Sequence, residues 1–394
     1  MKAQPKTDDM RNIGRFALFG AVAVALYAAL HGGGHEATPR WVVAFAGIAM
    51  FLLLLSRSHR EFVLPPAKLI LSWALFILWA GVSTIFSADI DISMGELLMY
   101  FGLFAFGFIA FSIPENERDI SNLLTALLIA CAVVTIAGWY IFLIGRFAID
   151  GGPEMVRHFV GTFYWKNPMA SFLILFFPLA LAFSLEGDIR RRFLCILLAI
   201  LMLGGLVLTR SRAGWISAIV ALIALFAPAV AAKFDKSKLA VLATILVLGI
   251  ALGLLLSPEG VIFERVASIS EIHTADLSDD QSTMERVEML SASLDIVADY
   301  PIFGVGTRAW PAVRGLYLGH LKYLPRFPHN AYLRAATENG IPGFILLCIA
   351  LLLTFVPLWR RCFGDGASLV SAGIAAGTTG LFIHMAVDIG SVYS

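Results

Sequence analysis

The sequence predicts an all-α polytopic membrane protein with about 11–12 transmembrane helices and one large loop on a single side of the membrane. Hydrophobic residues make up 59% of the 394 residues and charged residues only 14%, which is more apolar surface than a soluble core of this length can bury. Apolar runs of about 20 residues recur from end to end, the length that a membrane-spanning helix needs. These runs are continuous rather than alternating with a period of two, which excludes a closed β-barrel.

The apolar runs give a series of expected spans. Lys2, Lys6, Arg11 and Arg15 precede the first run, so the positive-inside rule places the N-terminus in the cytoplasm. Alternation from that start puts more than half of the 29 Lys and Arg residues in inside loops. The C-terminus then lies outside, which suggests that a twelfth helix has been lost or lies beyond the sequence. The expected spans are residues 13–31, 41–56, 66–86, 95–113, 120–145, 168–185, 193–209, 213–232, 239–257, 341–359 and 367–388.

Three parts of the chain are expected. Residues 1–257 hold transmembrane helices 1–9, residues 258–340 form a loop domain with short helices, and residues 341–394 hold the C-terminal transmembrane helices. The net charge of +1 gives no reason to expect a nucleic-acid partner. The four cysteines are scattered in or beside apolar runs without metal-ligand spacing, so we expect no metal, no cofactor and no disulfide framework.

Residues 258–340 form a long polar interval in a chain of apolar runs, and such a loop is where a membrane protein keeps its chemistry. Within it, Met284–Tyr300 is typical of an amphipathic helix that lies along the membrane surface. Gly304-Val305-Gly306 then predicts a turn. The apolar face of the expected helix is formed by Val287, Leu290, Leu294 and Val297. The Lys and Arg residues of the interval are Arg265, Arg286, Arg308, Arg314, Lys322, Arg326 and Arg334.

One histidine in this loop stands apart from the other histidines of the chain. His329-Asn330 precedes an expected short helix, Ala331–Asn339, with Asn330 as its N-cap. Gly340 supplies a left-handed end to that helix, and Pro342 is expected to stop it. His329 therefore lies at a helix start within a basic loop, which makes it the candidate functional histidine.

Two polar pairs are expected near the site. Glu338 lies in the last turn of the short helix, where the helix dipole disfavours a carboxylate, so Arg334 four residues earlier is expected to hold it. His384 and Asp388 are four residues apart near the outer end of the last span. A hydrogen-bonded pair within the helix is the favoured interpretation, and a supporting role in the site is the alternative.

Three other segments are expected on the outer side. Thr209–Trp215 places Arg210 and Arg212 in a tight turn where the next helix begins, an arrangement that favours a phosphate site over simple snorkelling of the arginines. Gly161–Pro168 is aromatic, which favours an interfacial belt over a surface that stacks on sugar rings. Ser87–Glu96 is a short acidic loop.

These motifs resemble those of a known family. His329-Asn330, followed after nine residues by Gly340-Ile341-Pro342-Gly343, resembles the histidine motif of bacterial O-antigen ligases. Arg286–Leu290 resembles their R-x3-L motif, and Thr209–Trp215 resembles their Ser-Arg-Ala/Gly-Trp turn. The order of many spans, one large late loop and closing helices is also similar. The wider superfamily includes O-antigen polymerases and protein O-oligosaccharyltransferases, which share a GT-C-like membrane fold.

The resemblance implies a glycosyltransferase that acts in lipopolysaccharide biosynthesis at the periplasmic face of the bacterial inner membrane. The implied reaction transfers O-antigen glycan from undecaprenyl diphosphate to a sugar hydroxyl of lipid A-core. His329 would be the general base, or instead a ligand of the diphosphate, with Asn330 and Glu338 in support. Guanidinium groups would neutralise the leaving diphosphate without a metal. These arginines are Arg210, Arg212, Arg265 and Arg286.

Two other functions remain open from the sequence. A polymerase of the same superfamily would use the same donor and differ only in its acceptor, another lipid-linked glycan. A lipid-linked glycan transporter belongs to a different class and places charges near mid-bilayer. In this sequence the middle of each expected span is nearly free of charge, which favours an enzyme over a transporter.

Overall fold

A computed structural model of the chain describes residues 8–32, 37–57, 64–113, 116–144, 158–163, 165–186, 188–231, 236–258, 260–263, 266, 281–318, 327–363 and 368–387. All regular secondary structure in these residues is helical, which confirms the all-α prediction. Eight helices among the described residues are long and apolar enough to cross a membrane. The protein is therefore an all-α polytopic membrane protein.

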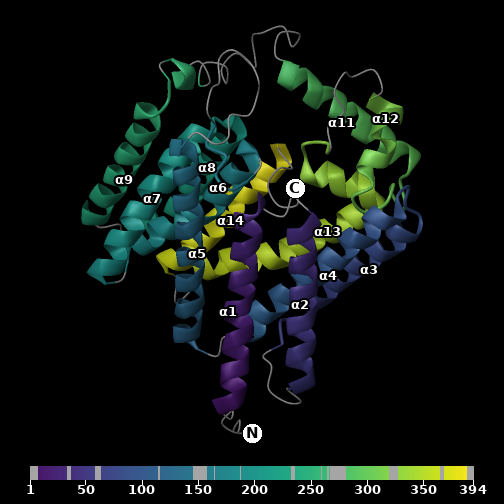
Figure 1. Cartoon of the computed structure of the whole chain (residues 1–394), viewed down its shortest axis with the longest axis horizontal. Helices are drawn as coiled ribbons and strands as arrows, with labels where there is room; N and C mark the ends of the chain where they lie inside the picture. The colour runs from purple at the N-terminus through teal and green to yellow at the C-terminus, as the bar shows by residue number, and fades with distance from the viewer. Residues whose placement is uncertain are drawn as a thin grey trace. The chain divides into compact units, whose positions relative to one another are not determined.

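A helix lies at the position of every expected span (Figure 1). Three of these helices carry shorter apolar stretches within their described residues: Phe16–Leu30, Thr38–Leu53 and Arg212–Ala227. The first nine helices are α1 (Asp8–Leu30), α2 (Ala37–Arg57), α3 (Ala67–Ile85), α4 (Ile90–Ser112), α5 (Glu117–Ile144), α6 (Lys166–Leu185), α7 (Ile189–Thr209), α8 (Arg212–Ala231) and α9 (Lys236–Leu255). They are followed by α11 (Gln281–Asp299), α12 (Trp310–Leu318), α13 (Ala331–Phe363) and α14 (Leu369–Val387).

One compact unit comprises Met1–Cys131, Ile296–Tyr317 and Ala335–Leu353. In this unit α2 packs against α1 and α4, and α3 packs against α4. The contact between α2 and α4 is lined by a small buried cluster that contains Ala44 and Met99. Small side chains at such a crossing let two membrane helices approach closely, and dispersion contacts then hold them together.

A second compact unit comprises Ala132–Asp295, Leu318–Arg334 and Thr354–Ser394. Helix α6 is its most enclosed span, and α6 packs against α7 and α14. Helix α14 also packs against α8, and α7 packs against α9. The buried alanines of α14, Ala372, Ala375 and Ala376, suit these close helix contacts.

Two element boundaries differ from the sequence expectation. The predicted short helix and the span that follows it form one element, α13, which is interrupted at Gly340 with φ 67° and ψ 179°. Pro342 does not stop a helix, because it lies in the first turn of the second segment, where a missing N–H costs nothing. The acidic segment Ser87–Glu96 is not a loop throughout, because Asp89 accepts the N–H of Ile92 and caps α4, which begins at Ile90.

Helix α11 confirms the predicted helix in the long loop but buries a different face. Met289, Ala292, Ser293 and Ile296 are buried, and the Ser293 hydroxyl donates to the Met289 carbonyl at 2.6 Å. The apolar face expected from the sequence is exposed at Val287, Leu290 and Leu294. An exposed apolar stripe is what a helix on a membrane surface requires, and that location stays a prediction.

Candidate functional site

His329 lies immediately before the first turn of α13. Asn330 confirms its expected role as N-cap, because its Oδ1 accepts the N–H groups of Tyr332 and Leu333, both at 3.0 Å. His329 itself has φ 45°, a left-handed conformation that few non-glycine residues adopt. The backbone of this half-buried histidine is thus set by the cap that follows it.

The same asparagine ties the start of α13 to α14. Its Nδ2 donates to the carbonyl of Ala386 at 2.8 Å, and the hydroxyl of Tyr332 donates to the carbonyl of Phe382 at 3.2 Å. Asn330 therefore uses both ends of its amide, one for the helix and one for the neighbouring span. This double use fixes the orientation of the segment that carries His329.

Arg334 and Phe327 pack together on either side of this cap. The Arg334 guanidinium lies over the Phe327 ring, 4.6 Å from the ring centroid, and both residues are buried. A cation over an aromatic face is stabilised by the ring quadrupole, most strongly where water is excluded. The pairing of Arg334 with Glu338 that the sequence suggested stays a prediction.

The other end of the short helix is closed by the loop that contains Gly304-Val305-Gly306. The N–H groups of Val305 and Gly306 donate to the carbonyls of Thr337 and Glu338 at 2.9 and 3.0 Å. The N–H of Ile341 donates back to the carbonyl of Pro301 at 2.8 Å. The last carbonyls of a helix have no partner within it, so a buried helix end needs such donors. The expected turn is confirmed, and its amides cap the helix.

Side chains of α3 complete this cap. Trp79 Nε1 donates to the carbonyl of Asn339 at 2.8 Å, and the buried hydroxyl of Ser83 lies 2.9 Å from the carbonyl of Glu338 and 2.7 Å from that of Phe303. Glu338, the expected supporting residue, is 1% exposed. Its backbone therefore takes part in closing the helix, while its assigned role in the site stays a prediction.

The Thr209–Trp215 segment contains the two-residue connection Arg210-Ser211 between α7 and α8. Arg210 is the C-cap of α7 with φ 52° and ψ 28°, and its N–H donates to the carbonyl of Val207 at 3.1 Å. The residue is only 2% exposed, and its Nη2 donates to Ser257 Oγ at 3.4 Å. A buried guanidinium at a turn is costly unless it meets polar or anionic groups, and the diphosphate-binding role expected for Arg210 stays a prediction.

Ser211 forms the start of α8. Its hydroxyl accepts the N–H of Gly214 at 3.1 Å, as an N-cap side chain does. Its own N–H donates to Thr209 Oγ1 at 3.3 Å, and the Trp215 indole donates to the carbonyl of Leu206 at 3.1 Å. Arg212, the first residue of α8, is half-buried. The turn thus places one buried and one half-buried arginine at a helix N-terminus, as the sequence predicted.

The two remaining arginines of the expected diphosphate site lie in the long loop. Arg286 is half-buried on α11, beside the exposed apolar stripe of that helix. Arg265 lies outside the described residues. Convergence of Arg210, Arg286 and His329 around one diphosphate stays a prediction.

His384 contacts a residue of another helix, and its expected pair with Asp388 stays a prediction. Its Nδ1 lies 2.8 Å from the hydroxyl of Ser171 on α6, and both residues are buried. Ser171 also donates to the carbonyl of Asn167 at 3.1 Å. Asp388 lies outside the described residues. The contact joins α14 to the beginning of α6, which the sequence alone gave no reason to connect.

The aromatic segment before α6 is packed against its neighbours. Phe159 is fully buried and its ring centroid lies 5.1 Å from that of Trp139. The Phe163 ring lies 5.5 Å from that of Phe172 within this region. Lys166 Nζ lies 5.9 Å from the centroid of the half-buried Trp165 ring. This packing accounts for several of the aromatic residues without a sugar ligand.

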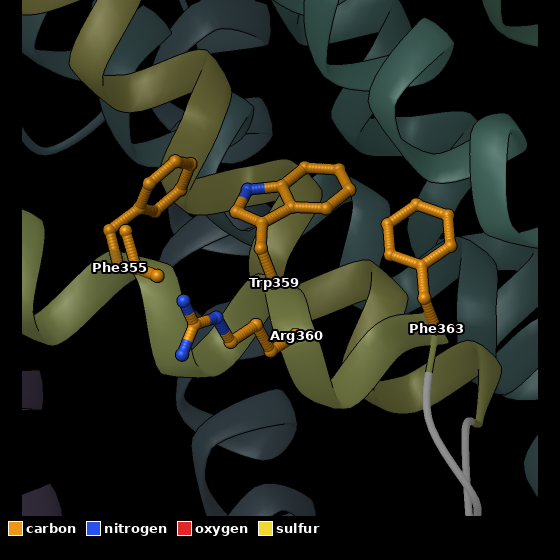
Figure 2. Close-up of a pocket in the computed structure, with 5 residues that line it drawn as sticks. Phe355, Trp359, Arg360 and Phe363 are labelled. Carbon is orange, nitrogen blue, oxygen red and sulfur yellow. The ribbon is translucent and has the colours of Figure 1, made fainter.

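A hollow of about 420 Å³ lies along the second segment of α13, lined by Phe355, Val356, Trp359, Arg360 and Phe363. Figure 2 shows the three aromatic rings one turn apart on α13 with Arg360 beside them. The Trp359 indole donates to Thr379 Oγ1 at 3.2 Å. None of the expected site residues lines this hollow, and aromatic rings beside arginine are typical of a membrane interface.

A buried charge cluster that was not expected from the sequence joins α2, α4 and the loop before α12. Glu96 forms an ion pair with Arg40, and the Nη1 of Arg308 lies 3.9 Å from the Oε2 of Glu96. The side chains of Arg40 and Glu96 are 7% and 0% exposed. Glu96 and Arg40 are distant in sequence and lie near span ends, so nothing in a single sequence pairs them.

Comparison with known proteins finds a match to a family model. Residues 197–348 match the model of the O-antigen ligase family. The matched segment begins in α7 and ends in α13, so it contains Arg210, Arg212, Arg286 and His329. None of the curated proteins compared with the chain matches it.

Proposed function

We propose that this chain is a member of the O-antigen ligase-like superfamily, whose model it matches over residues 197–348, and that it ligates O-antigen glycan to lipid A-core. As a multi-pass membrane protein of this superfamily it is expected to act on lipid-linked substrates. The proposed donor is a glycan on undecaprenyl diphosphate, and the proposed acceptor is a sugar hydroxyl of lipid A-core. The reaction would take place at the periplasmic face of the bacterial inner membrane.

The proposed reaction exchanges one bond to the anomeric carbon for another. The oxygen of the acceptor hydroxyl forms a bond to this carbon, and the bond from the carbon to the diphosphate oxygen breaks. The acceptor proton passes to the neutral imidazole of His329, and the diphosphate leaves as an anion on its lipid. Because a diphosphate is a stable anion, it needs positive charge rather than a proton donor.

The observation that carries this proposal is the placement of His329. Its left-handed backbone directly precedes an N-cap whose amide also binds the Ala386 carbonyl, so the histidine is held at a defined helix start. Positioning of this kind is what a general base requires, because proton transfer needs hydrogen-bond geometry. Arg210, Arg212 and Arg286, with Arg265, are the proposed diphosphate ligands, since their guanidinium groups donate paired hydrogen bonds to phosphate oxygens.

The test is transfer by the purified full chain from a polyprenyl-diphosphate-linked glycan to lipid A-core. His329→Ala and His329→Gln are both expected to lower kcat by about 10²–10⁴-fold, because neither side chain accepts the acceptor proton as imidazole does. His31→Ala is the control, since His31 is an exposed residue at the end of α1. Wild-type kcat for His329→Ala would remove the catalytic assignment. A rise in donor KM at constant kcat would instead assign His329 to the diphosphate.

The acceptor distinguishes a ligase from a polymerase of the same superfamily. Supplying lipid A-core as sole acceptor yields product from a ligase and none from a polymerase. A second lipid-linked glycan as sole acceptor gives the opposite pattern. Glycan flux across liposomes without any transfer would support the transporter in place of both.

A further inference from the structure

The apolar hollow along the last turns of α13 has no part in the proposed transfer reaction. Three aromatic rings at four-residue intervals, Phe355, Trp359 and Phe363, line it together with Val356 and Arg360 (Figure 2). Its volume of about 420 Å³ lies within the range of about 300–1,000 Å³ that is typical of small-molecule sites. All of these residues belong to the second compact unit, so the hollow is formed within one unit.

Contacts with α14 fix the wall of the hollow. The Trp359 indole donates to Thr379 Oγ1 at 3.2 Å, and this hydroxyl in turn donates to the carbonyl of Ala375 at 2.7 Å. The centroid of the Phe355 ring lies 5.3 Å from that of the Phe382 ring. Two of the three rings are therefore held by a neighbouring span, and these contacts define the shape of the hollow.

The hollow opens toward the surroundings of the protein. Val356 and Phe363 are 39% and 60% exposed, and Arg360 is also exposed. Helix α13 is long and apolar enough to cross a membrane, and Arg360 and Arg361 lie in its last turn. The positive-inside rule predicts the cytoplasmic side for this end of the helix. An apolar hollow at such a position meets acyl chains rather than water, and a chain that enters it gains dispersion contacts with the rings.

The charge beside the hollow favours an anionic lipid over a second copy of the chain. Within the described residues, the guanidinium groups of Arg360 and Arg361 form no hydrogen bond or ion pair. A symmetric dimer through this surface would place the same two cations of each copy opposite each other, which is unfavourable. A lipid phosphate instead accepts the paired hydrogen bonds of a guanidinium, and basic residues at a membrane surface attract anionic lipids.

We propose that the hollow binds one anionic phospholipid of the membrane, with its phosphate on Arg360 and an acyl chain against Phe355, Trp359 and Phe363. This inference goes beyond the transferase function and does not depend on it, because the lipid is neither donor nor acceptor. Arg360 supplies the preference for an anionic headgroup, and the rings supply the apolar contact that holds the chain.

The test measures the quenching of tryptophan fluorescence by lipids with brominated acyl chains, in bilayer nanodiscs that hold the full chain. Brominated phosphatidylglycerol and brominated phosphatidylcholine are compared at equal mole fraction. The chain has eight tryptophans, so the signal of Trp359 is the part that is lost in Trp359→Phe, which keeps an aromatic ring. That part is expected to be quenched more strongly by phosphatidylglycerol. Arg360→Gln is expected to lower the apparent affinity for phosphatidylglycerol about 10-fold, because a charge-assisted hydrogen bond is lost.

Arg361→Gln is the matched control, since Arg361 is an exposed arginine of the same turn that does not line the hollow. Both variants lose the same charge, so an equal loss of affinity in the two would assign the preference to the helix end and overturn the inference. Equal quenching of Trp359 by the two lipids in the wild type would also overturn it. Quenching by neither lipid would do the same, because a protein surface such as a second copy would then cover the hollow.

Should Arg360→Gln fail to fold, Arg360→Lys replaces it. Lysine keeps the charge without the paired hydrogen bonds of a guanidinium, so it is expected to lower the affinity for phosphatidylglycerol by a smaller factor. Unchanged affinity in Arg360→Lys would count against binding of the phosphate by the guanidinium.

Discussion

Replacing Gly340 by alanine tests how the short helix that begins after Asn330 is terminated. Gly340 has φ 67° and ψ 179°, a region that is essentially restricted to glycine. A Cβ at this position would lie 2.1 Å from the carbonyl oxygen of Ile302 and 2.9 Å from that of Pro301. Backbone atoms cannot move aside as a flexible side chain does. The loop that caps the helix would therefore have to shift as a whole.

The cost of this change follows from two terms. Backbone strain at a glycine-only conformation contributes about 1–3 kcal/mol. A shifted loop also weakens the bond from the Ile341 N–H to the Pro301 carbonyl and the bonds from Val305 and Gly306 to the helix end, which are worth about 1 kcal/mol each. If all three bonds are lost, these terms give a destabilisation of about 4–6 kcal/mol, which is a large share of the roughly 5–15 kcal/mol of a typical folded protein.

Thermal unfolding in detergent measures this prediction. Gly340→Ala is expected to lower Tm by at least about 5 °C. Gly107→Ala is the matched control, because Gly107 lies within α4 and a Cβ there would have no heavy atom within 4 Å. In that helix alanine is favoured by about 0.5–1 kcal/mol, so the control should be neutral or stabilising. Equal Tm values for Gly340→Ala and wild type would refute the capping argument.

Three further substitutions probe individual contacts. Asn330→Asp keeps the helix cap but loses the donor to the Ala386 carbonyl, so transfer activity should fall more than helix content, as measured by turnover and circular dichroism. Ser171→Ala removes the partner of His384 and should destabilise the protein by about 1–3 kcal/mol in denaturant unfolding, whereas no change would mean that the bond contributes nothing. Hydrogen bonds from the backbone N–H groups of Arg191 and then Arg190 lower the pKa of the Asp188 carboxyl below 3.8. The ionised carboxylate therefore stabilises the fold above its unfolded pKa, and this stabilisation is lost as pH falls through the folded pKa. Replacing Asp188 by Asn should therefore make Tm less dependent on pH in that acid range.

The membrane spans and the helix cap could be predicted from the sequence because both depend on residues close together in the chain. A run of about 20 apolar residues specifies a membrane helix wherever it occurs in the chain, so each expected span coincides with a helix. The Asn330 cap and the interruption at Gly340 depend on residues within one or two turns, and both are confirmed.

The contacts that hold the candidate site could not be predicted from the sequence, because they join residues far apart in the chain. Asn330 binds the carbonyl of Ala386, 56 residues away, and Ser171 binds His384 across 213 residues. Helix α11 shows the same limit within one element. The hydrophobic spacing predicted an apolar face that the structure leaves exposed, because periodicity shows which side chains are apolar but not which neighbouring element covers them.

The structural support of the loop extends beyond the residues that match the O-antigen ligase family. Trp79, Ser83, Ser93 and Glu96 lie before the matched segment, yet each bonds or pairs with a residue between 303 and 339. The carbonyls at the end of the short helix take donors from α3, and Arg308 takes its counterion from α4. A buried helix end or a buried carboxylate without these partners costs the full desolvation of each group. Residues 197–348 expressed alone would leave several such groups without partners, so we expect that fragment not to form the native loop. A fragment that begins at α3 contains all of these partner residues except Arg40.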